Sequence, residues 1–472
     1  MTETYFDLFG VTPDKLERLM VSALSRGGEY ADIFFEYTTT DEMMLRDHEV
    51  NSVESTADYG AGIRVIRDEK TGYAFSEKTD MRDLEKAALF AAGIADAPAA
   101  QRTAPGLRPV RFTNHYPILQ GWDAFPLARR KGWLTDLDHR LSEASPYIRK
   151  VTCALATSIT KVMFYNSEGD FFCDLRPMTA VHLTCVAQKD GKSEMLSYSR
   201  SYRSGSEMLT DALRDGIVSY IASRLEPLFE AGRPKGGQMP VVLGSGSSGI
   251  LLHEAIGHAF EADFNRKGIS IFAERMGQKI CSEKITVVDD GTVAGNRGAL
   301  NVDDEGIIGQ KTYMVTEGVL TSYLHDRISA RHYGVAPTGN GRRESFRYQP
   351  IPRMRATYML DGDCTEEDLI RSVRKGIFVD NFTNGEVAIG EGDFTFYVKS
   401  GWMIEDGRLT APVKDINIIG NGPQALADIT GVAAGSTLDD STWTCGKDQY
   451  CPVSCGMPSV LVSSLTVGGL SL

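Results

Sequence analysis

The chain has 472 residues, 42% hydrophobic and 24% charged, which is the composition of a globular protein with roughly two to four folding units. Its net charge of -13 argues against a nucleic-acid partner, which needs clustered Lys and Arg, and no apolar run approaches the roughly 20 residues of a membrane helix. The N-terminal MTETYFDLFG lacks the features of a secretory signal, so we expect a cytoplasmic protein whose eight cysteines stay reduced.

The first predicted unit, residues 1–109, combines helices and strands. Thr12 suits an N-cap and Pro13 suits the first helical position, and apolar residues then recur at helical spacing. Alternating segments predict strands at 31–37, 42–54 and 60–76, the last with a hairpin at 68–72. An Ala-rich helix over 80–95 and an Ala/Pro-rich stretch complete this unit.

The second predicted unit, residues 110–231, contains two helices around a set of strands. Helices are expected at 126–143 and 206–229, and strands at 148–157, 159–166, 170–187 and 193–203. A Gly/Pro-rich linker follows, and the third unit, 239–472, opens with a strand, a Gly/Ser turn and an apolar helix. The expected fold class is α+β, a mixed α/β multi-domain chain with largely antiparallel sheets and a C-terminal domain that carries the motif HExxxH.

Two motifs overlap where this third unit begins. Gly244, Gly246 and Gly249 form G-x-G-x-x-G between a strand and a helix, the local pattern of a dinucleotide-binding loop. That fingerprint also needs a second strand ending in an acidic residue about 20 residues later, and no strand precedes Glu261 or Asp263. A tight strand-to-helix turn is the favoured interpretation, and a nucleotide-binding oxidoreductase is the alternative.

The second motif, His253-Glu254-x-x-x-His258, is the stronger signal. Zinc binds imidazole nitrogen, and a glutamate beside the first ligand can act as general base for a water at the metal. The familiar H-E-x-x-H has one residue fewer, and histidines five residues apart diverge by about 140° on a regular helix. Both can face one metal only if the helix has a π-type bulge or ends between them, which Gly257 permits. Ordinary core or surface histidines are the alternative.

Later segments follow this helix in a specific order. They are NVDDEG (301–306), TEGVLTSYLHDRISAR (316–331), TGNGRRES (338–345), PRM (352–354), CGK (445–447), PVSCGMP (452–458) and LTVGG (465–469). Together with GILLHEAIGHAFEAD they make nearly the whole chain resemble the TldD/PmbA family of zinc metallopeptidases. Because one subunit type of that family lacks HExxxH, this chain resembles the catalytic, TldD-type subunit.

The resemblance implies one zinc ion per chain, with His253, His258 and Cys445 as ligands and Glu254 as general base. It also implies that the substrates are peptides or unfolded protein segments, and that the chain forms a homodimer or a heterodimer with a paralogue lacking HExxxH. From the residues alone, Cys451 and Cys455 remain alternatives to Cys445, although small buried fillers are the favoured interpretation for them. A non-catalytic, peptide-binding or chaperone-like subunit is the competing hypothesis for the function.

Other candidates carry weaker signals. Arg342 and Arg343 could bind a substrate carboxylate or carbonyls, with a solvated loop or an interface as the alternative. The acidic run 303–305 could suggest a second metal, but a solvated turn is the favoured interpretation. Arg355-Ala356 stand where the family usually has a Thr-Asn pair, which would affect specificity if that segment contacts substrate.

Overall fold

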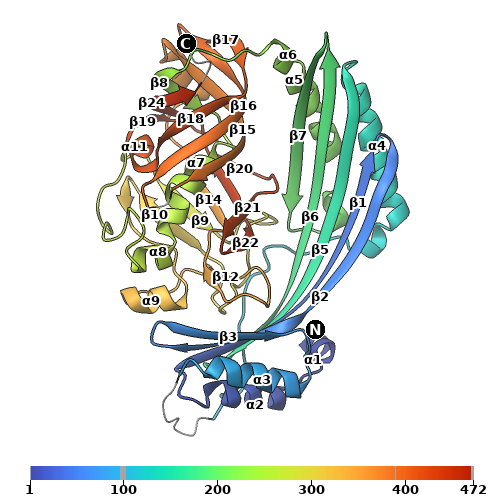
Figure 1. Ribbon diagram of the computed structural model, residues 1–472, viewed down its shortest axis with the longest axis vertical. Coiled ribbons are helices and arrows are strands. Elements are labelled where there is room, and N and C mark those ends of the chain that lie inside the picture. Colours follow the sequence, from blue (N-terminus) through green and yellow to red (C-terminus); the bar gives the residue numbers. More distant parts are fainter. Residues whose placement is uncertain (1, 96–102, 389, 469–472) are drawn as a thin grey trace.

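The computed structural model describes residues 2–95, 103–388 and 390–468, and it confirms the expected α+β class. A long curved sheet forms one side of the molecule and the C-terminal part of the chain forms the other (Figure 1). The chain passes from one side to the other between α6 and β8. Among the described residues, no helix has both the length and the apolar character needed to cross a membrane.

The curved sheet has seven strands in the order β3-β2-β1-β5-β6-β4, with β7 paired to β6. Its pairings are antiparallel except that of β4 with β6. The strands are β1 (Tyr30–Arg46), β2 (Glu49–Arg67), β3 (Lys70–Ser76), β4 (Arg108–Pro109), β5 (Ile148–Asn166), β6 (Asp170–Lys189) and β7 (Lys192–Tyr202). Since β1 pairs with β5, the predicted units 1–109 and 110–231 contribute to one sheet.

Three of the expected strands are wrong in their bounds. The expected strand 42–54 is instead a hairpin, because Asp47 and His48 adopt positive φ angles of 50° and 72° that turn the chain between β1 and β2. The expected strands 148–157 and 159–166 are one continuous strand, β5, held in register by β1 on one side and β6 on the other. Local sequence does not show that such long strands have partners along their whole length.

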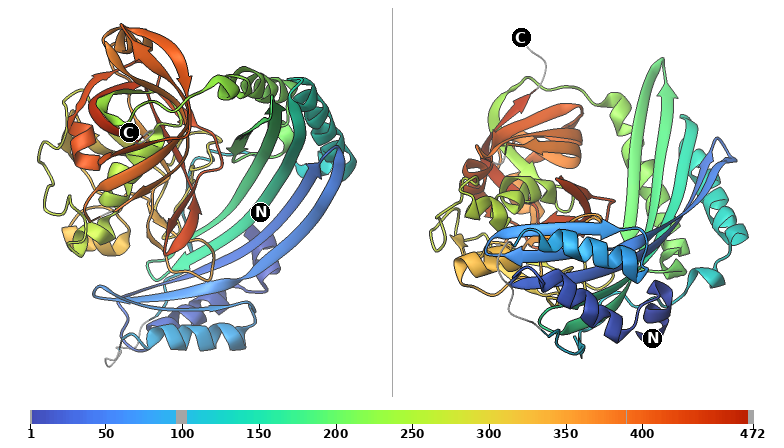
Figure 2. Two further views of the ribbon diagram at one scale, coloured as in Figure 1. Left: turned by 45° about the horizontal axis from the view of Figure 1, so that its top comes forward. Right: turned by 60° about the horizontal axis from the view of Figure 1, so that its bottom comes forward.

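Helices cover the two ends of this sheet (Figures 1 and 2). Near the N-terminus, α2 and α3 bury apolar residues against β1 and β2, and Thr12 caps α2 as predicted by accepting a hydrogen bond from the backbone of Lys15. At the other end, α4 and α5 form a separate core with β5, β6 and β7. The helices are α1 (Thr2–Phe9), α2 (Pro13–Leu24), α3 (Met81–Ala92), α4 (Leu127–Glu143), α5 (Asp211–Leu225) and α6 (Pro227–Glu230), so the single helix expected over 206–229 is wrong.

In the C-terminal part, five strands pair in a closed ring, β15-β8-β24-β18-β16-β15, with β17 and β19 attached to it. Beside the ring lies a second sheet of order β11-β10-β9-β14-β23-β20, and two small hairpins, β12–β13 and β21–β22, complete the strands. The ring and its attachments are β8 (Gly237–Leu243), β15 (Lys375–Val387), β16 (Asp393–Glu405), β17 (Arg408–Val413), β18 (Ile416–Asn421), β19 (Ile429–Val432) and β24 (Val460–Gly468).

The second sheet and the hairpins are β9 (Val287–Asp290), β10 (Lys311–Thr316), β11 (Val319–Leu320), β12 (Gly341–Arg342), β13 (Ile351–Pro352), β14 (Ala356–Met359), β20 (Thr437–Asp439), β21 (Thr444–Lys447), β22 (Gln449–Pro452) and β23 (Ser454–Met457). The helices here are α7 (Gly249–Leu252), α8 (Ala262–Arg266), α9 (Arg327–Tyr333), α10 (Glu366–Arg371) and α11 (Gly422–Ala427). The short α7 contacts β14 and β23 and belongs to the main C-terminal core. This packing holds the start of the HExxxH segment, which follows α7, in place.

Candidate metal centre

The HExxxH segment is not a regular α-helix. After α7 the chain forms a π-helical turn, η3 (His253–Gly257), in which the backbone N–H of His258 donates to the carbonyl of His253. A short 3-10 turn, η4 (His258–Phe260), follows. The π-turn takes up the extra residue of the motif, so histidines five positions apart come to lie on the same side. The expected irregularity is thereby confirmed.

Gly257 has a role in this turn that differs from the expected one. Its φ is -55°, an ordinary helical value, so the backbone does not need a glycine for its conformation. A Cβ at this position would lie 2.1 Å from Sδ of Met354. A side chain at this position would therefore force Met354, which packs directly against the π-turn, to shift.

Three side chains converge at one point, namely His253, His258 and Cys445 of β21. Their candidate ligand atoms all lie within 4.8 Å of one another, and all three residues are buried. The Sγ atom of Cys445 is 3.3 Å from Nε2 of His258, and the two imidazole rings are 5.0 Å apart at an interplanar angle of 81°. Two imidazole nitrogens and one thiolate form a donor set that suits zinc with an open fourth position.

The electrostatics of the triad fit a cation. Burial alone would raise the pKa of Cys445, but His253 and His258 more than offset it and lower that pKa to about 5. Nδ1 of His253 is buried and has no hydrogen-bond partner among the described residues. A zinc ion bound to this thiolate and to the imidazole nitrogen would give that nitrogen the partner that it lacks.

A carboxylate fixes the orientation of His258. Nδ1 of His258 lies 3.0 Å from Oε2 of Glu261, which leaves Nε2 to face Cys445. Burial opposes ionisation of Glu261, but Lys447 and His258 outweigh it and lower the pKa of that carboxyl to about 2. This is the arrangement in which a carboxylate orients a metal-binding histidine and raises its basicity.

Two cations hold the same carboxylate and the hairpin that bears the cysteine. Nζ of Lys447 lies 3.1 Å from Glu261 and 2.6 Å from Asp263. The guanidinium of Arg353 donates to the backbone carbonyls of Cys445 and Gln449, and its Nε lies 3.6 Å from Glu261. The sequence alone does not indicate these roles for Glu261, Lys447 or Arg353. Their only signals are the position of Glu261 three residues after His258 and the occurrence of the two cations in CGK and PRM.

Glu254 lies beside the first histidine on the π-turn and is half-buried. Burial is the main cause that raises the pKa of its carboxyl, His253 and His258 oppose the rise, and Cys445 adds to it. The structure thus places an acid of raised pKa beside the three candidate ligands, which is where a general base is needed.

The other two C-terminal cysteines lie outside this cluster. Cys451 is the cross-strand neighbour of Cys445 in the β21–β22 hairpin, and Cys455 lies on β23. Both are buried, and burial raises the pKa of each thiol. The structure therefore brings Cys445, and neither of these two, to the histidines.

Arg342 and Arg343 are buried rather than part of a solvated loop. Arg342 donates to the carbonyls of Met354 and Pro452, and Arg343 donates to the carbonyl of Asp304 at 2.9 Å. Neither belongs to the triad of candidate ligands.

The solvated acidic turn expected at 303–305 is also wrong, because all three carboxylates are buried. Asp303 accepts backbone N–H groups of Glu305 and Ile307, Asp304 pairs with Arg176, and Glu305 pairs with Arg64. These three carboxylates can be buried because each accepts hydrogen bonds from backbone N–H groups or pairs with an arginine.

Arg355 belongs to the scaffold. Its side chain is fully buried and its Nε donates to Asp289 at 2.8 Å, while its backbone N–H donates to the other oxygen of the same carboxylate at 2.7 Å. Ala356 begins β14 and is also buried. In this chain Arg355 therefore helps to hold β14 against β9.

The glycine-rich turn serves packing. A Cβ at Gly249 would lie 2.3 Å from the backbone nitrogen of Gly456, and one at Gly244 would lie 2.8 Å from the carbonyl oxygen of Val379. Gly246 has a φ of +84° and closes the turn. These glycines allow α7 and the preceding turn to approach β15 and β23, which agrees with the favoured interpretation of a tight turn.

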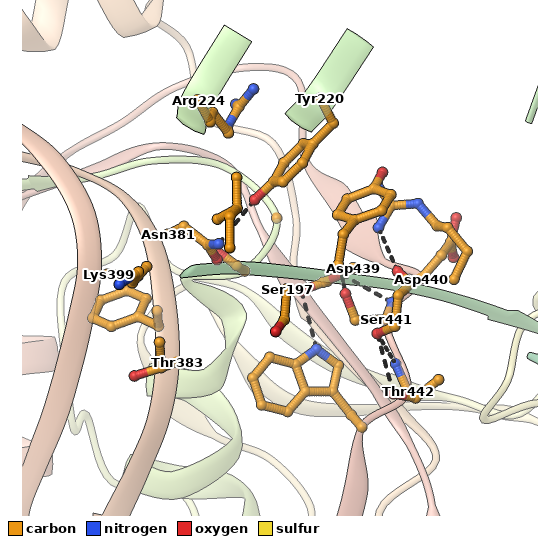
Figure 3. Close-up of a pocket in the computed structure, with 18 of the residues that line it drawn as sticks. Ser197, Tyr220, Arg224, Asn381, Thr383, Lys399, Asp439, Asp440, Ser441 and Thr442 are labelled. Carbon is orange, nitrogen blue, oxygen red and sulfur yellow. Dashed lines mark hydrogen bonds between the residues drawn. The ribbon is translucent and has the colours of Figure 1, made fainter. Parts of the chain in front are cut away.

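A cavity of about 950 Å³ lies between the curved sheet and the C-terminal part and reaches the segment that precedes β21. β7 and α5 form one wall, β15 and β16 another, and residues 437–443 a third. Figure 3 shows its mixed lining, in which the amide of Asn381 donates to the hydroxyl of Tyr220 at 2.8 Å. Trp443, which donates to Asp439, lines the cavity two residues before Cys445.

Comparison with known proteins shows the family to which this chain belongs. The chain matches the PmbA/TldA metallopeptidase domain 1 over residues 31–95, the central domain over 122–226 and the C-terminal domain over 236–469. It is 33% identical to a metalloprotease TldD homolog of Haemophilus influenzae and 35% identical to one of Buchnera aphidicola, with 94% and 93% of each chain covered. The chain belongs to the PmbA/TldD metallopeptidase family.

A solved structure supports the same fold. The crystal structure of TldE from Thermococcus kodakarensis superposes with a TM-score of 0.76 over 96% of this chain and all of that one (100%), at 18% sequence identity. The fold is thus shared at low sequence identity.

Proposed function

We propose that this protein is a zinc-dependent peptidase that hydrolyses peptides or unfolded polypeptide segments. The observation that carries the proposal is the convergence of His253, His258 and Cys445 at the π-turn that also bears Glu254. The names of the relatives, which are metalloproteases, support the same class of reaction.

Each residue of the site has a chemical task in this proposal. His253, His258 and Cys445 would hold the zinc ion, which when bound supplies Lewis acidity and lowers the pKa of water. Glu254 would accept a proton from the attacking water and then donate it to the leaving amine. Glu261 would keep Nδ1 of His258 protonated, so that Nε2 remains free for the metal.

The substrate would reach this site through the 950 Å³ cavity. Its lining mixes aromatic rings, hydroxyl groups and charged side chains, which suits an extended polypeptide of varied sequence better than one small ligand. The segment 437–443 runs from this cavity into β21, so a peptide lying along it would be led toward Cys445.

A dimer is part of the proposal. We propose a heterodimer with a paralogue that lacks HExxxH, with a homodimer as the other arrangement, and the structural similarity to a TldE protein supports such pairing. The eight free cysteines are consistent with the proposed reducing, cytoplasmic location. Light scattering of the chain alone and mixed with the paralogue tests the assembly, and an active monomer would contradict it.

The decisive experiment is metal analysis joined to a peptide-cleavage assay. Purified protein should contain about one zinc per chain, as expected for a three-ligand open site. Cleavage should stop after chelation and return with added zinc. Protein that cleaves peptides after complete chelation, or that contains no transition metal as purified from zinc-supplemented cells, would contradict the proposal.

A further inference from the structure

A second cavity, of about 280 Å³, lies beside the β21–β22 hairpin. Four of its lining arginines are at least nine-tenths buried and a fifth is half-buried. They come from β6, the residue after β7, the loop between β9 and β10, and β12 with the residue after it. The five are Arg176, Arg203, Arg297, Arg342 and Arg343. The acids that line the same cavity are Glu36, Asp304 and Glu344.

The acids neutralise only part of this charge. Asp304 pairs with Arg176 at 2.6 Å, and Glu344 lies at the exposed rim, where it accepts the backbone N–H of Tyr450. Burial is the main cause that raises the pKa of Glu36 to about 7. Arg176 also pairs with Asp174 at 2.9 Å and Arg343 lies 3.4 Å from Asp32, so the lining arginines without a described carboxylate in direct contact are Arg203, Arg297 and Arg342.

Two of the arginines are held by neutral groups alone. Arg342 donates to backbone carbonyls, and Arg297 donates to the hydroxyl of Ser201, the carbonyl of Trp443 and the hydroxyl of Thr444. Within the described part of the chain, neither forms an ion pair with a carboxylate. Both are thus positioned without a described carboxylate in direct contact.

Arg203 is the least satisfied of the five. It is 6% exposed, and no described group accepts a hydrogen bond from its guanidinium, whose Nε is fully buried. Its guanidinium lies over the ring of Tyr116, 5.2 Å from the ring centroid. Burial, opposed by Tyr116 and reinforced by Arg176, lowers the pKa of Arg203 to about 10. A buried guanidinium without an acceptor is costly to the fold, so an external acceptor would stabilise it.

The cavity is open and close to the metal centre. Its rim includes the exposed residues Glu344, Thr444 and Tyr450, so solutes can reach the arginines. Thr444 directly precedes Cys445, and strand alternation sends their side chains to opposite faces of the hairpin. The two sites therefore lie on opposite faces of this two-stranded hairpin, and a peptide that occupied both would pass around the hairpin.

We propose that this arginine-lined cavity binds a carboxylate of the peptide substrate, either the C-terminal carboxylate or an acidic side chain, with Arg203 as its principal donor. The planar guanidinium offers two parallel N–H groups that match the two oxygens of a carboxylate. The inference rests on the proposed peptidase function for the identity of the substrate. It adds a preference for peptides with a negative charge away from the cleaved bond.

Binding is tested separately from cleavage by using the full chain with Glu254→Gln. Its affinity is measured for three versions of one hexapeptide: a free C-terminal acid without acidic side chains, its C-terminal amide, and the amide with one Asp. We expect at least one carboxylate-bearing peptide to bind about 10- to 100-fold more tightly than the neutral amide, as typical for charge-assisted hydrogen bonds. Which of the two gains affinity identifies the source of the carboxylate.

The variant Arg203→Gln in the same background should lose that preference and bind the neutral amide unchanged. Removing a buried charge that has no acceptor should not lower the melting temperature, which checks the fold. Arg203→Lys, which keeps the charge but not the fork, should retain part of the preference. The matched control is Arg371→Gln, which removes an exposed arginine (side chain 73% exposed) outside both cavities.

Equal affinity for all three peptides, no binding of any, or an intact preference in both Arg203 variants would overturn the carboxylate site. Failure of the peptidase proposal has a different signature. The parent chain with zinc would then cleave none of the peptides, even though the acidic ones still bind more tightly than the amide.

Discussion

Sγ of Cys445 lies 3.3 Å from Nε2 of His258, although 187 residues separate the two along the chain. The contact joins the β21–β22 hairpin to the π-turn. Two further contacts hold the hairpin there: Arg353 donates to the backbone carbonyl of Cys445, and Lys447 pairs with Glu261. The thiol of Cys445 and the ion pairs of Lys447 with Glu261 and Asp263 therefore connect the two parts of the chain that form the candidate metal centre.

Cys445→Ala should remove the third ligand and with it most of the zinc. The loss of affinity should exceed the 10- to 100-fold that typically follows removal of a residue that only orients a ligand. Metal analysis at equal free zinc measures the effect. Cys455→Ala, another buried thiol outside the cluster, is the control and should keep its zinc. Full zinc content in the Cys445→Ala protein would assign the third ligand elsewhere.

Gly257→Ala should disturb the π-turn without touching a ligand. The new Cβ would meet Sδ of Met354 at 2.1 Å, and such overpacking typically costs about 1–3 kcal/mol of stability. We expect a lower melting temperature together with weaker zinc binding. The control is Gly132→Ala on the exposed side of α4, where no atom lies within 4 Å of the added Cβ. Because alanine favours a helix over glycine, the control should be stabilised by about 0.5–1 kcal/mol.

Glu36 predicts a pH dependence of stability. Burial raises the pKa of this carboxyl from 4.5 to about 7, and its environment includes Arg176, Asp304, Thr38 and the backbone N–H of Phe346. A pKa that is raised on folding gives stability that is complete below about pH 4.5 and is lost as the pH rises to about 7. The loss for a shift of this size is on the order of 3 kcal/mol.

The Gln variant at position 36 isolates this contribution. Glu36→Gln can still accept the Phe346 N–H, but it cannot ionise, so its stability should fall less between pH 5 and pH 8 than that of the parent. Denaturant unfolding at the two pH values measures the difference. Glu143→Gln, an exposed residue at the end of α4, should follow the parent curve. Parallel curves for parent and Glu36→Gln would show that Glu36 does not titrate in this range.

The sequence predicted those parts of the fold that depend on interactions between residues close together in the chain. The cap at Thr12 and the irregular helix at His253–Gly257 follow from side-chain hydrogen bonding and from residue spacing. Strand length was not predictable in this way, because β5 is continuous only through its partners β1 and β6. Bounds therefore failed where tertiary pairing, rather than the local sequence, decides them.

The residues of the candidate site also differ in whether the local sequence predicts them. The histidine pair and Glu254 are visible as a motif, whereas Cys445 was assigned by family resemblance. The second cavity was not visible at all, because it collects arginines from segments that are far apart in the sequence, such as Arg176 and Arg343. A buried arginine without an acceptor, such as Arg203, can be recognised only once the fold is known.

Glu254→Gln separates catalysis from structure. A general base acts in the transition state, so its loss should reduce peptide cleavage by about 10²–10⁴-fold while the amide keeps the shape of the side chain. Zinc content should survive, because the three candidate ligands remain. The melting temperature should not fall, since the half-buried carboxyl, whose pKa is raised mainly by burial, is replaced by a neutral group.

The measurements belong on one preparation: zinc content, thermal melting and turnover of a fixed peptide. Glu283→Gln, whose side chain is 79% exposed, controls for the removal of one negative charge. If HExxxH serves only structure, Glu254→Gln should change the melting temperature and leave turnover close to that of the control. Near-normal turnover with full zinc would exclude Glu254 as the base and leave His253, His258 and Cys445 as a metal site whose catalytic partner lies elsewhere. A fall in turnover of the expected size with zinc and stability intact would assign proton transfer to this carboxyl.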